Sequence, residues 1–197
     1  MLCYHIDAIY GKQGDIIKLL FASDIHGSAY FCQKLIESIY IENPDKIILL
    51  GDILYHGPRN DLPKDYNPKE VISMLNDLSN NIICVKGNCD AEVDQMVLDF
   101  TLNENYIVLS ADELNLFITH GHKFNTENPP PMNKNDILIH GHTHISVCKE
   151  FGDGNLYLNP GSVSIPKEET ENGYLIYENY KFIWKNFNNQ LINILEV

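Results

Sequence analysis

Short apolar runs alternate with segments of helical periodicity along the first two-thirds of the chain. The runs predict buried strands over residues 16–22, 46–50 and 82–85. Between the first two runs, Phe31, Leu35 and Ile39 recur four residues apart, on one face of a helix. Asn67 before Pro68 indicates a second helix start, because the Asn side chain caps the first turn and proline fits its first position. Helices are therefore expected over residues 28–42, 67–78 and 90–98.

After Thr101 the pattern changes to a succession of short strands. These strands are expected over residues 106–109, 114–119, 136–139, 146–151, 156–158, 174–177, 182–187 and 191–195. Residues 152–155 are typical of a hairpin turn, and the three prolines at 129–131 predict a surface loop over 125–135. Units of βαβ type followed by mostly antiparallel strands indicate an α/β fold, in which two sheets pack face to face with helices outside. A length of 197 residues predicts a single domain over residues 1–197.

Acidic residues dominate the charge of the chain, with 27 Asp and Glu against 14 Lys and Arg and a net charge of −13. This charge repels nucleic-acid polymers and anionic membrane surfaces, so neither is an expected partner. A small phosphate-ester substrate would need a local source of positive charge. No apolar run approaches the roughly 18 residues of a membrane span, and residues 1–15 lack the features of a secretion signal. The five cysteines show no paired spacing, which predicts reduced thiols in a cytoplasmic protein.

Polar side chains with metal-binding chemistry follow five of the predicted strands. They are Asp24, His26, Asp52, Asn88, His120, His122, His140, His142 and His144. Because ligands bind beyond the carboxyl ends of strands in α/β sheets, these side chains are expected along one rim. Alternate residues of an extended chain project to the same side, so Asp24 with His26, and His142 with His144, can act as paired clamps. Imidazole and carboxylate together suit Zn, Mn, Fe and Co, and the number of ligands exceeds the four of one zinc ion. Two metals that share a bridging carboxylate would use them all.

Several of these residues also have a purely structural interpretation when taken alone. Asp52 could cap a helix, and Asn88 beside a glycine could occupy a turn. His120 and His122 could be ordinary polar residues at a strand end. His140 could orient His142 or merely pack at the end of its strand. The functional interpretation is favoured because each strand end supplies a compatible ligand in turn.

Five sequence blocks resemble the pattern of the calcineurin-like metallophosphoesterase superfamily. They are SDIHG at 23–27, GD at 51–52, GN at 87–88, THG at 119–121 and GHTH at 141–144. Longer stretches, such as LGDILYHGPRN and LNPGSVSIPK, are similar to small bacterial phosphodiesterases of this superfamily. The resemblance runs from about residue 17 to the C-terminus, which leaves residues 1–15 as an expected N-terminal extension. It implies a four-layer αββα sandwich of two mixed sheets.

The resemblance also implies a ligand set for two divalent metal ions. The first would be held by Asp24, His26, Asp52 and His144. The second would be held by Asp52, Asn88, His120 and His142, with Asp52 bridging. Mn is the ion most often associated with such proteins, and Zn, Ni, Fe or Co could replace it according to supply.

The implied activity is a metal-dependent phosphodiesterase, in which a hydroxide between the two metals attacks phosphorus in line with the leaving oxygen. Asn88 would direct its amide at the phosphate, and Arg59 is a candidate phosphate clamp, although it could equally be a surface arginine. Many superfamily members have a histidine directly after the GN pair, where it protonates the leaving group, but here that residue is Cys89. With Cys89, His122 or a metal-bound water as the candidate proton donors, aryl phosphodiesters are expected to react better than alkyl monoesters.

A different class of function is a non-catalytic metal-binding scaffold of the same fold that contacts other proteins. Loss of metal ligands would indicate such a scaffold, and here all seven are present. The apolar residues Phe182, Ile183 and Trp184 could mark the surface of a homo-oligomer, but buried positions in the sandwich explain them more simply.

Overall fold

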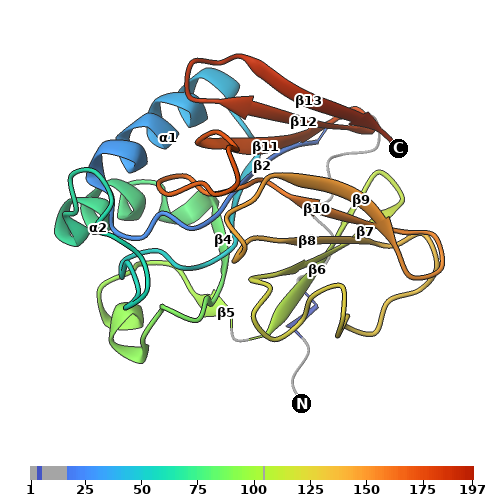
Figure 1. The fold of residues 1–197 in the computed structure, drawn as a ribbon, viewed down its shortest axis with the longest axis horizontal. Helices are drawn as coiled ribbons and strands as arrows, with labels where there is room; N and C mark the ends of the chain where they lie inside the picture. The colour runs from blue at the N-terminus through green and yellow to red at the C-terminus, as the bar shows by residue number, and fades with distance from the viewer. Residues whose placement is uncertain (1–3, 6–16, 104) are drawn as a thin grey trace.

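The computed structural model describes residues 4–5, 17–103 and 105–197, and in this part of the chain two mixed β-sheets pack face to face (Figure 1). The seven-stranded sheet has, in spatial order, β13 (Leu191–Glu196), β12 (Lys181–Asn186), β11 (Gly173–Glu178), β2 (Lys18–Ala22), β3 (Lys46–Leu49), β4 (Ile82–Val85) and β5 (Leu102–Asn103). The six-stranded sheet has β1 (Tyr4–His5), β6 (Tyr106–Ala111), β7 (Leu114–Thr119), β8 (Ile137–His140), β10 (Asn155–Asn159) and β9 (Val147–Phe151). The predicted α/β fold of two mixed sheets with helices outside is confirmed.

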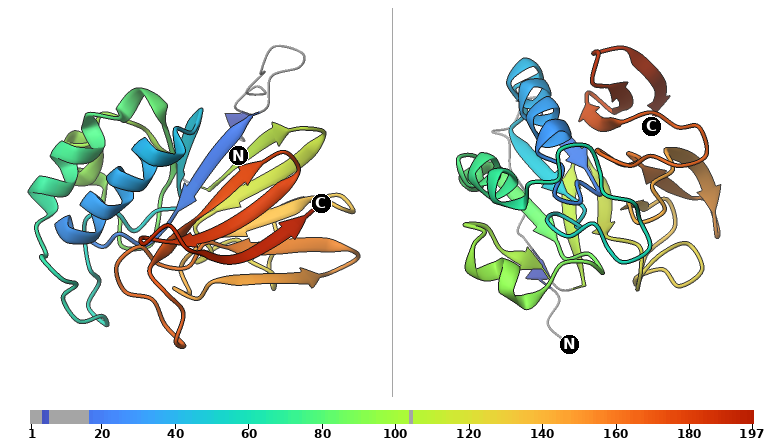
Figure 2. Two further views of the ribbon diagram at one scale, coloured as in Figure 1. Left: turned by 90° about the horizontal axis from the view of Figure 1, so that it is seen from above. Right: turned by 60° about the vertical axis from the view of Figure 1, so that its left-hand side comes forward.

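Both described α-helices cover the outer face of the seven-stranded sheet (Figure 2). They are α1 (Ala29–Glu42) and α2 (Pro68–Asn76), and the described 3-10 helices are η1 (Ser79–Asn81) and η2 (Glu92–Met96). As predicted, Asn67 caps α2 by accepting a hydrogen bond from the backbone N–H of Glu70 at 3.4 Å. Leu35 and Ile39 of α1 are buried against this sheet. The helix expected over residues 90–98 is the shorter η2.

The outer face of the six-stranded sheet is covered by the loop between β7 and β8. The ring of Phe124 in this loop packs edge-on against Tyr106, with centroids 5.3 Å apart, and the hydroxyl of Thr119 donates to the Phe124 carbonyl. Consecutive prolines in the loop lack backbone donors and disfavour a helix. In the described residues the fourth layer of the sandwich is therefore a loop, where the resemblance implied a helix.

The strands after Thr101 pair mostly antiparallel, as predicted, but β7 and β8 are parallel, as are β8 and β10. The β7–β8 loop crosses over the sheet and returns the chain in the same direction, as a parallel pair requires. The carboxyl ends of β7 and β8 consequently lie at the same end of their sheet.

The C-terminal strands contribute large side chains to the core between the sheets. Phe182 and Trp184 are buried there, and the indole N–H of Trp184 donates to the carbonyl of Asn159 at 2.7 Å. The prediction of buried positions is confirmed for these two, whereas Ile183 is only partly buried and packs against the core beneath α1. A homo-oligomer stays a prediction. None of the described helices is long and apolar enough to cross a membrane.

The predicted N-terminal extension, residues 1–15, lies outside the described residues apart from Tyr4 and His5. These two residues form β1, which pairs in parallel with Ile107 and Val108 of β6.

Candidate metal centre

The loops that follow β2, β3, β4, β7 and β8 meet at one end of the two sheets. They bring the seven predicted metal ligands together. Six are His and Asp side chains in groups whose ligand atoms lie within 4.8 Å of one another, and Oδ1 of Asn88 lies 3.0 Å from Nε2 of His120. Two of these groups are Asp24 with His26 and His144, and Asp52 with His120 and His142. A third group, His26 with Asp52 and Cys89, shares one member with each of these two.

Five of the ligand residues have left-handed backbone conformations. The φ angles are 58° at Asp24, 50° at His26, 55° at Asp52, 66° at His142 and 62° at His144. The expected clamps on an extended chain are therefore wrong in their backbone geometry, although the paired side chains do converge. Residues other than glycine adopt this region rarely, at a cost of about 1–3 kcal/mol each, and such strain concentrates at functional sites. Tight left-handed turns let successive loop residues aim at one point.

In the first group, three buried atoms surround a small volume. Oδ1 of Asp24 lies 3.6 Å from Nε2 of His26 and 3.3 Å from Nε2 of His144, and the two nitrogens are 3.2 Å apart. Oδ1 of Asp24 is buried and has no hydrogen-bond partner. A buried carboxylate oxygen without a partner is costly, and a cation bound there would satisfy it.

The second group shares Asp52 with the first. Oδ2 of Asp52 lies 3.4 Å from Nε2 of His120 and 3.7 Å from Nε2 of His26, so this carboxylate faces both groups. Nε2 of His120 is also 3.0 Å from Oδ1 of Asn88 and 3.2 Å from Nδ1 of His142. The two groups therefore adjoin one another at the Asp52 carboxylate.

Backbone carbonyls orient three of the histidine rings. Nδ1 of His26 lies 2.7 Å from the carbonyl of Tyr55, Nδ1 of His120 lies 2.7 Å from that of Leu50, and Nδ1 of His144 lies 2.9 Å from that of Ile165. Each Nδ1 must carry the proton it donates, which leaves Nε2 to face the centre. Outer contacts of this kind are typical of metal-bound histidine. Together with the unpartnered Asp24 oxygen, they fit divalent cations.

The charges of the centre favour ionised carboxylates. Burial alone raises the pKa of Asp24, but the close imidazoles of His144 and His26 and the positive charge of His120 hold that pKa well below its usual range. Burial lowers the pKa of His120, yet the nearby Asp52 and Asp24 outweigh burial and raise it to about 9. The negative potential that holds a proton on His120 also attracts a metal cation, which competes for the same nitrogen.

Asp90 supports the centre from behind, and the sequence reasoning missed it. Its buried carboxylate accepts hydrogen bonds from the backbone N–H groups of Asp52 at 2.8 Å, Ile53 at 2.7 Å and Gly87 at 2.7 Å. These bonds join the loop after β3 to the loop after β4. Its position two residues after Asn88, within the family-like GNCD stretch, was the available signal.

The family-like stretch LNPGSVSIPK supplies a second support that sequence reasoning did not assign. Ser162 and Ser164 donate hydrogen bonds to the backbone carbonyl of Asp24, and the amide of Asn159 donates to the Gly141 carbonyl and the Thr143 hydroxyl. These contacts fix the loops that carry Asp24 and the last two histidines.

Two glycines allow the ligand loops to approach one another. A Cβ atom at Gly87 would collide with Oδ1 of Asp52, and one at Gly141 would collide with the side chains of Ser23 and Asp24. Glycine is required at both places by close approach.

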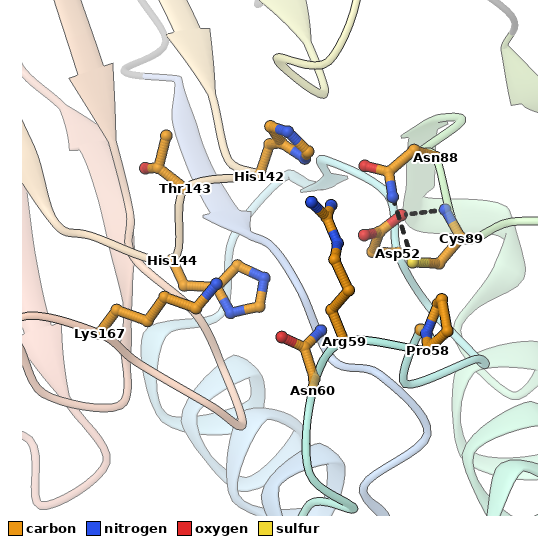
Figure 3. A pocket seen from close by; sticks show the side chains of 11 residues that line it. Asp52, Pro58, Arg59, Asn60, Asn88, Cys89, His142, Thr143, His144 and Lys167 are labelled. Atoms are coloured by element: carbon orange, nitrogen blue, oxygen red, sulfur yellow. Dashed lines mark hydrogen bonds between the residues drawn. The ribbon is translucent and has the colours of Figure 1, made fainter.

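A pocket of about 410 Å³ opens over the centre. It is lined by Asp52, Gly57, Pro58, Arg59, Asn60, Asn88, Cys89, His142, Thr143, His144 and Lys167. Arg59, the predicted phosphate clamp, extends into this pocket with its guanidinium directed towards Asp52 and His142 (Figure 3). Lys167 was not predicted and lies on the His144 side of the same pocket.

The two candidate proton donors differ in position and in pKa. Cys89 lines the pocket, where burial and the neighbouring carboxylates raise its pKa to about 12. His122 has its ring centroid 5.3 Å from that of His120, and burial together with the charges of its neighbours lowers its pKa to about 4. At neutral pH Cys89 therefore keeps its proton, whereas His122 has none to donate as an acid.

His140 takes no direct part in orienting His142. Its ring stacks on Tyr157 with centroids 4.1 Å apart, and Nδ1 lies 3.0 Å from the Gly141 carbonyl. These contacts favour the packing interpretation of this residue.

Comparison with known proteins agrees with this geometry. Residues 17–181 match the model of the calcineurin-like phosphoesterase superfamily domain. The chain is 43% identical over 164 residues to phosphodiesterase YfcE of Escherichia coli strain K12, which covers 83% of this chain and 89% of the relative. It is 30% identical over 152 residues to phosphodiesterase MJ0936 of Methanocaldococcus jannaschii, covering 74% of this chain and 83% of that protein.

Among solved structures, that of the E. coli phosphoesterase YfcE superposes with a TM-score of 0.87 at 40% sequence identity, over 91% of this chain and 98% of the other. The family match covers most of the chain. The chain belongs to the calcineurin-like phosphoesterase superfamily.

Proposed function

We propose that this protein is a phosphodiesterase that uses two divalent metal ions. The observation that carries the proposal is the pair of adjoining ligand groups that share Asp52, one of which contains the buried, unpartnered Oδ1 of Asp24. The phosphodiesterase names of both relatives support the reaction class.

The first ion would be held by Asp24, His26, Asp52 and His144, and the second by Asp52, Asn88, His120 and His142. When bound, such ions polarise phosphoryl oxygens and lower the pKa of coordinated water. Mn is our first choice, because carboxylate, amide and imidazole ligands all suit it, with Zn, Ni, Fe and Co as competitors. Within a chain of net charge −13, this centre offers a phosphate group strong local positive charge.

Three residues of the pocket would act on the substrate directly. Arg59 would bind non-bridging phosphate oxygens, because a guanidinium matches phosphate geometry. Oδ1 of Asn88 faces the centre next to His120, while its amide nitrogen lies 3.2 Å from Sγ of Cys89. Because Cys89 directly follows the GN pair, where many superfamily members carry the histidine that protonates the leaving group, its thiol would lie near the leaving group.

Proton transfer to the leaving group is the weak part of this site. The raised pKa of Cys89 makes it a poor acid, and the lowered pKa of His122 leaves that imidazole neutral. Aryl leaving groups, which need little protonation, would therefore react faster than alkyl ones. A small aryl or nucleotide diester fits the proposal better than an alkyl monoester.

A metal-reconstituted activity panel tests the proposal. The metal-stripped protein is loaded with Mn, Mg, Zn, Ni or Co and assayed with bis(p-nitrophenyl) phosphate and with glycerol 2-phosphate. We expect hydrolysis that depends on metal and is greatest for the aryl diester. Equal or faster turnover of glycerol 2-phosphate would contradict the diester preference, and binding of metal without hydrolysis of any ester would favour the scaffold alternative.

We further propose that the protein works in the cytoplasm. Four cysteines of the described residues, Cys32, Cys84, Cys89 and Cys148, are free thiols, as expected under reducing conditions. Thiol titration of protein purified with and without reductant tests this, and disulfide-linked species in freshly lysed cells would count against it.

A further inference from the structure

Two cationic side chains, Arg59 and Lys167, line the pocket from turns that are anchored to the metal centre. Arg59 lies just after Gly57, where a Cβ atom would come within 3.0 Å of Sγ of Cys89. The backbone N–H of Lys167 donates to the carbonyl of His144 at 3.0 Å, and Thr170 closes the turn by donating to the carbonyl of Lys167 at 2.7 Å. Both cations are thus carried by turns that contact residues of the metal centre or its pocket.

Neither side chain forms an ion pair or a hydrogen bond with any residue that the structure describes. By contrast, Lys18 and Lys185 are paired with Glu42, and Lys181 with Glu196. In a protein with 27 acidic residues and 14 basic ones, two unpaired cations in one pocket leave positive charge free for a ligand.

The position of Lys167 separates it from the reacting phosphate. Arg59 points towards Asp52 and His142, whereas Lys167 lies on the His144 side, across the pocket from Cys89 (Figure 3). If the leaving group lies at Cys89, the other ester group of a bound diester would lie on the side of Lys167. Two divalent ions would carry four positive charges, of which Asp24, Asp52 and the hydroxide between the ions would balance three. A diester monoanion would balance the fourth, so the charge of Lys167 is surplus for such a substrate.

We propose that Lys167 forms a second anion subsite, and that the preferred substrates are phosphodiesters that carry an additional negative group on the ester that is not released. This inference rests on the proposed function and names its substrate class. A carboxylate, sulfonate or further phosphate at this place would form a charge-assisted hydrogen bond with the Lys167 ammonium. Arg59, by comparison, would serve any diester.

Equilibrium binding tests the subsite without any turnover. Diphenylphosphinate and (3-carboxyphenyl)phenylphosphinate mimic a diester but cannot be hydrolysed, and they differ by one carboxylate. In calorimetric titrations of the Mn-loaded protein, we expect the carboxylated probe to bind about tenfold more tightly. Lys167→Gln should reduce this ratio to less than threefold. Lys134→Gln, which removes an exposed positive charge outside the pocket, should preserve the ratio.

Arg59→Gln distinguishes the roles of the two cations. It should weaken the binding of both probes and leave the ratio of their affinities unchanged. Equal binding of the two probes by the wild type, or an unchanged ratio in Lys167→Gln, would overturn the subsite. A matched pair of esters, p-nitrophenyl phenyl phosphate and its 3-carboxyphenyl analogue, distinguishes this failure from that of the proposed function. If both esters are hydrolysed at equal rates, only the subsite is wrong; if neither is hydrolysed with any metal, the phosphodiesterase proposal falls and the subsite with it.

Discussion

Two clusters of buried charged groups in this molecule differ in the source of the cations that neutralise their carboxylates. At the end of α1, both carboxylate oxygens of Glu42 are used, by Lys18 at 2.8 Å, Lys185 at 2.6 Å and the hydroxyl of Tyr174 at 3.1 Å. In the metal centre, Oδ1 of Asp24 has no hydrogen-bond partner. The Glu42 cluster is neutralised by the protein's own cations and stabilises the fold. The metal centre needs a cation from outside, and this difference marks it as functional.

Substitution of the shared ligand should have the largest effect. Asp52→Asn keeps the size of the side chain but removes the charge that faces both ligand groups, so we expect kcat for bis(p-nitrophenyl) phosphate to fall at least about 10³-fold, or roughly 4 kcal/mol. Steady-state kinetics with Mn measures this. Full activity in Asp52→Asn would refute the two-metal proposal.

Metal addition should stabilise the wild type, since only the folded protein presents the complete centre. At about one hundred times the dissociation constant, binding contributes about 2.7 kcal/mol, which is a rise in Tm of roughly 5–10 °C for a domain of this size. Asp24→Asn should lose most of this rise in differential scanning calorimetry. An equal rise in both proteins would place the metal elsewhere.

Glu42→Gln should lower the stability of the protein and leave its response to metal intact, which is the reverse of the result expected for Asp24→Asn. It leaves two lysines without their carboxylate, at a cost of about 2 kcal/mol in the free energy of unfolding. The variant should keep the full rise in Tm on Mn addition. Urea denaturation of the wild type and the variant measures the loss in the free energy of unfolding. If the variant lost the rise in Tm on Mn addition, the Glu42 cluster and the metal centre could not be regarded as independent.

Replacement of Cys89 by histidine should restore a proton donor beside the ligands. Because general acid catalysis matters most for poor leaving groups, we expect about a tenfold rise in activity on glycerol 2-phosphate relative to bis(p-nitrophenyl) phosphate. Cys89→Ser is the matched control and should not change this ratio. The same ratio in all three proteins would show that the leaving group is not protonated from this position.

The smallest effect concerns pH. Burial alone raises the pKa of Glu42, but its hydrogen bonds with Lys18 and Lys185 outweigh burial and lower it below 4.5. A folded-state pKa below the unfolded one means that the contribution is present above about pH 4.5 and is lost as the pH falls. The difference in unfolding free energy between wild type and Glu42→Gln should therefore shrink from pH 7 to pH 3.5. A difference that is constant with pH would contradict the ion-pair explanation.

The sequence was sufficient for most of the elements and for naming the candidate ligands that the loops bring together, because apolar periodicity and residue chemistry are local properties. It predicted α2 from the Asn67 cap, and it predicted the approach of strand ends that unites Asp24 with His144. It was insufficient for the parallel pairing of β7 and β8, which depends on the path of a long loop. Asp90, Asn159 and Lys167 were missed for a related reason: their roles consist of contacts with backbone groups or with a pocket that only the folded chain forms.

The left-handed backbone at Asp24, His26, Asp52, His142 and His144 bears on protein engineering. Copying the ligand side chains onto the strand ends of another sandwich would not reproduce the site, since an extended backbone would aim them apart. A transplant would need the whole turns, with glycine at 87 and 141 and the anchoring carboxylate of Asp90. To transfer this centre to another protein, the loops must be transferred together with the ligands that they carry.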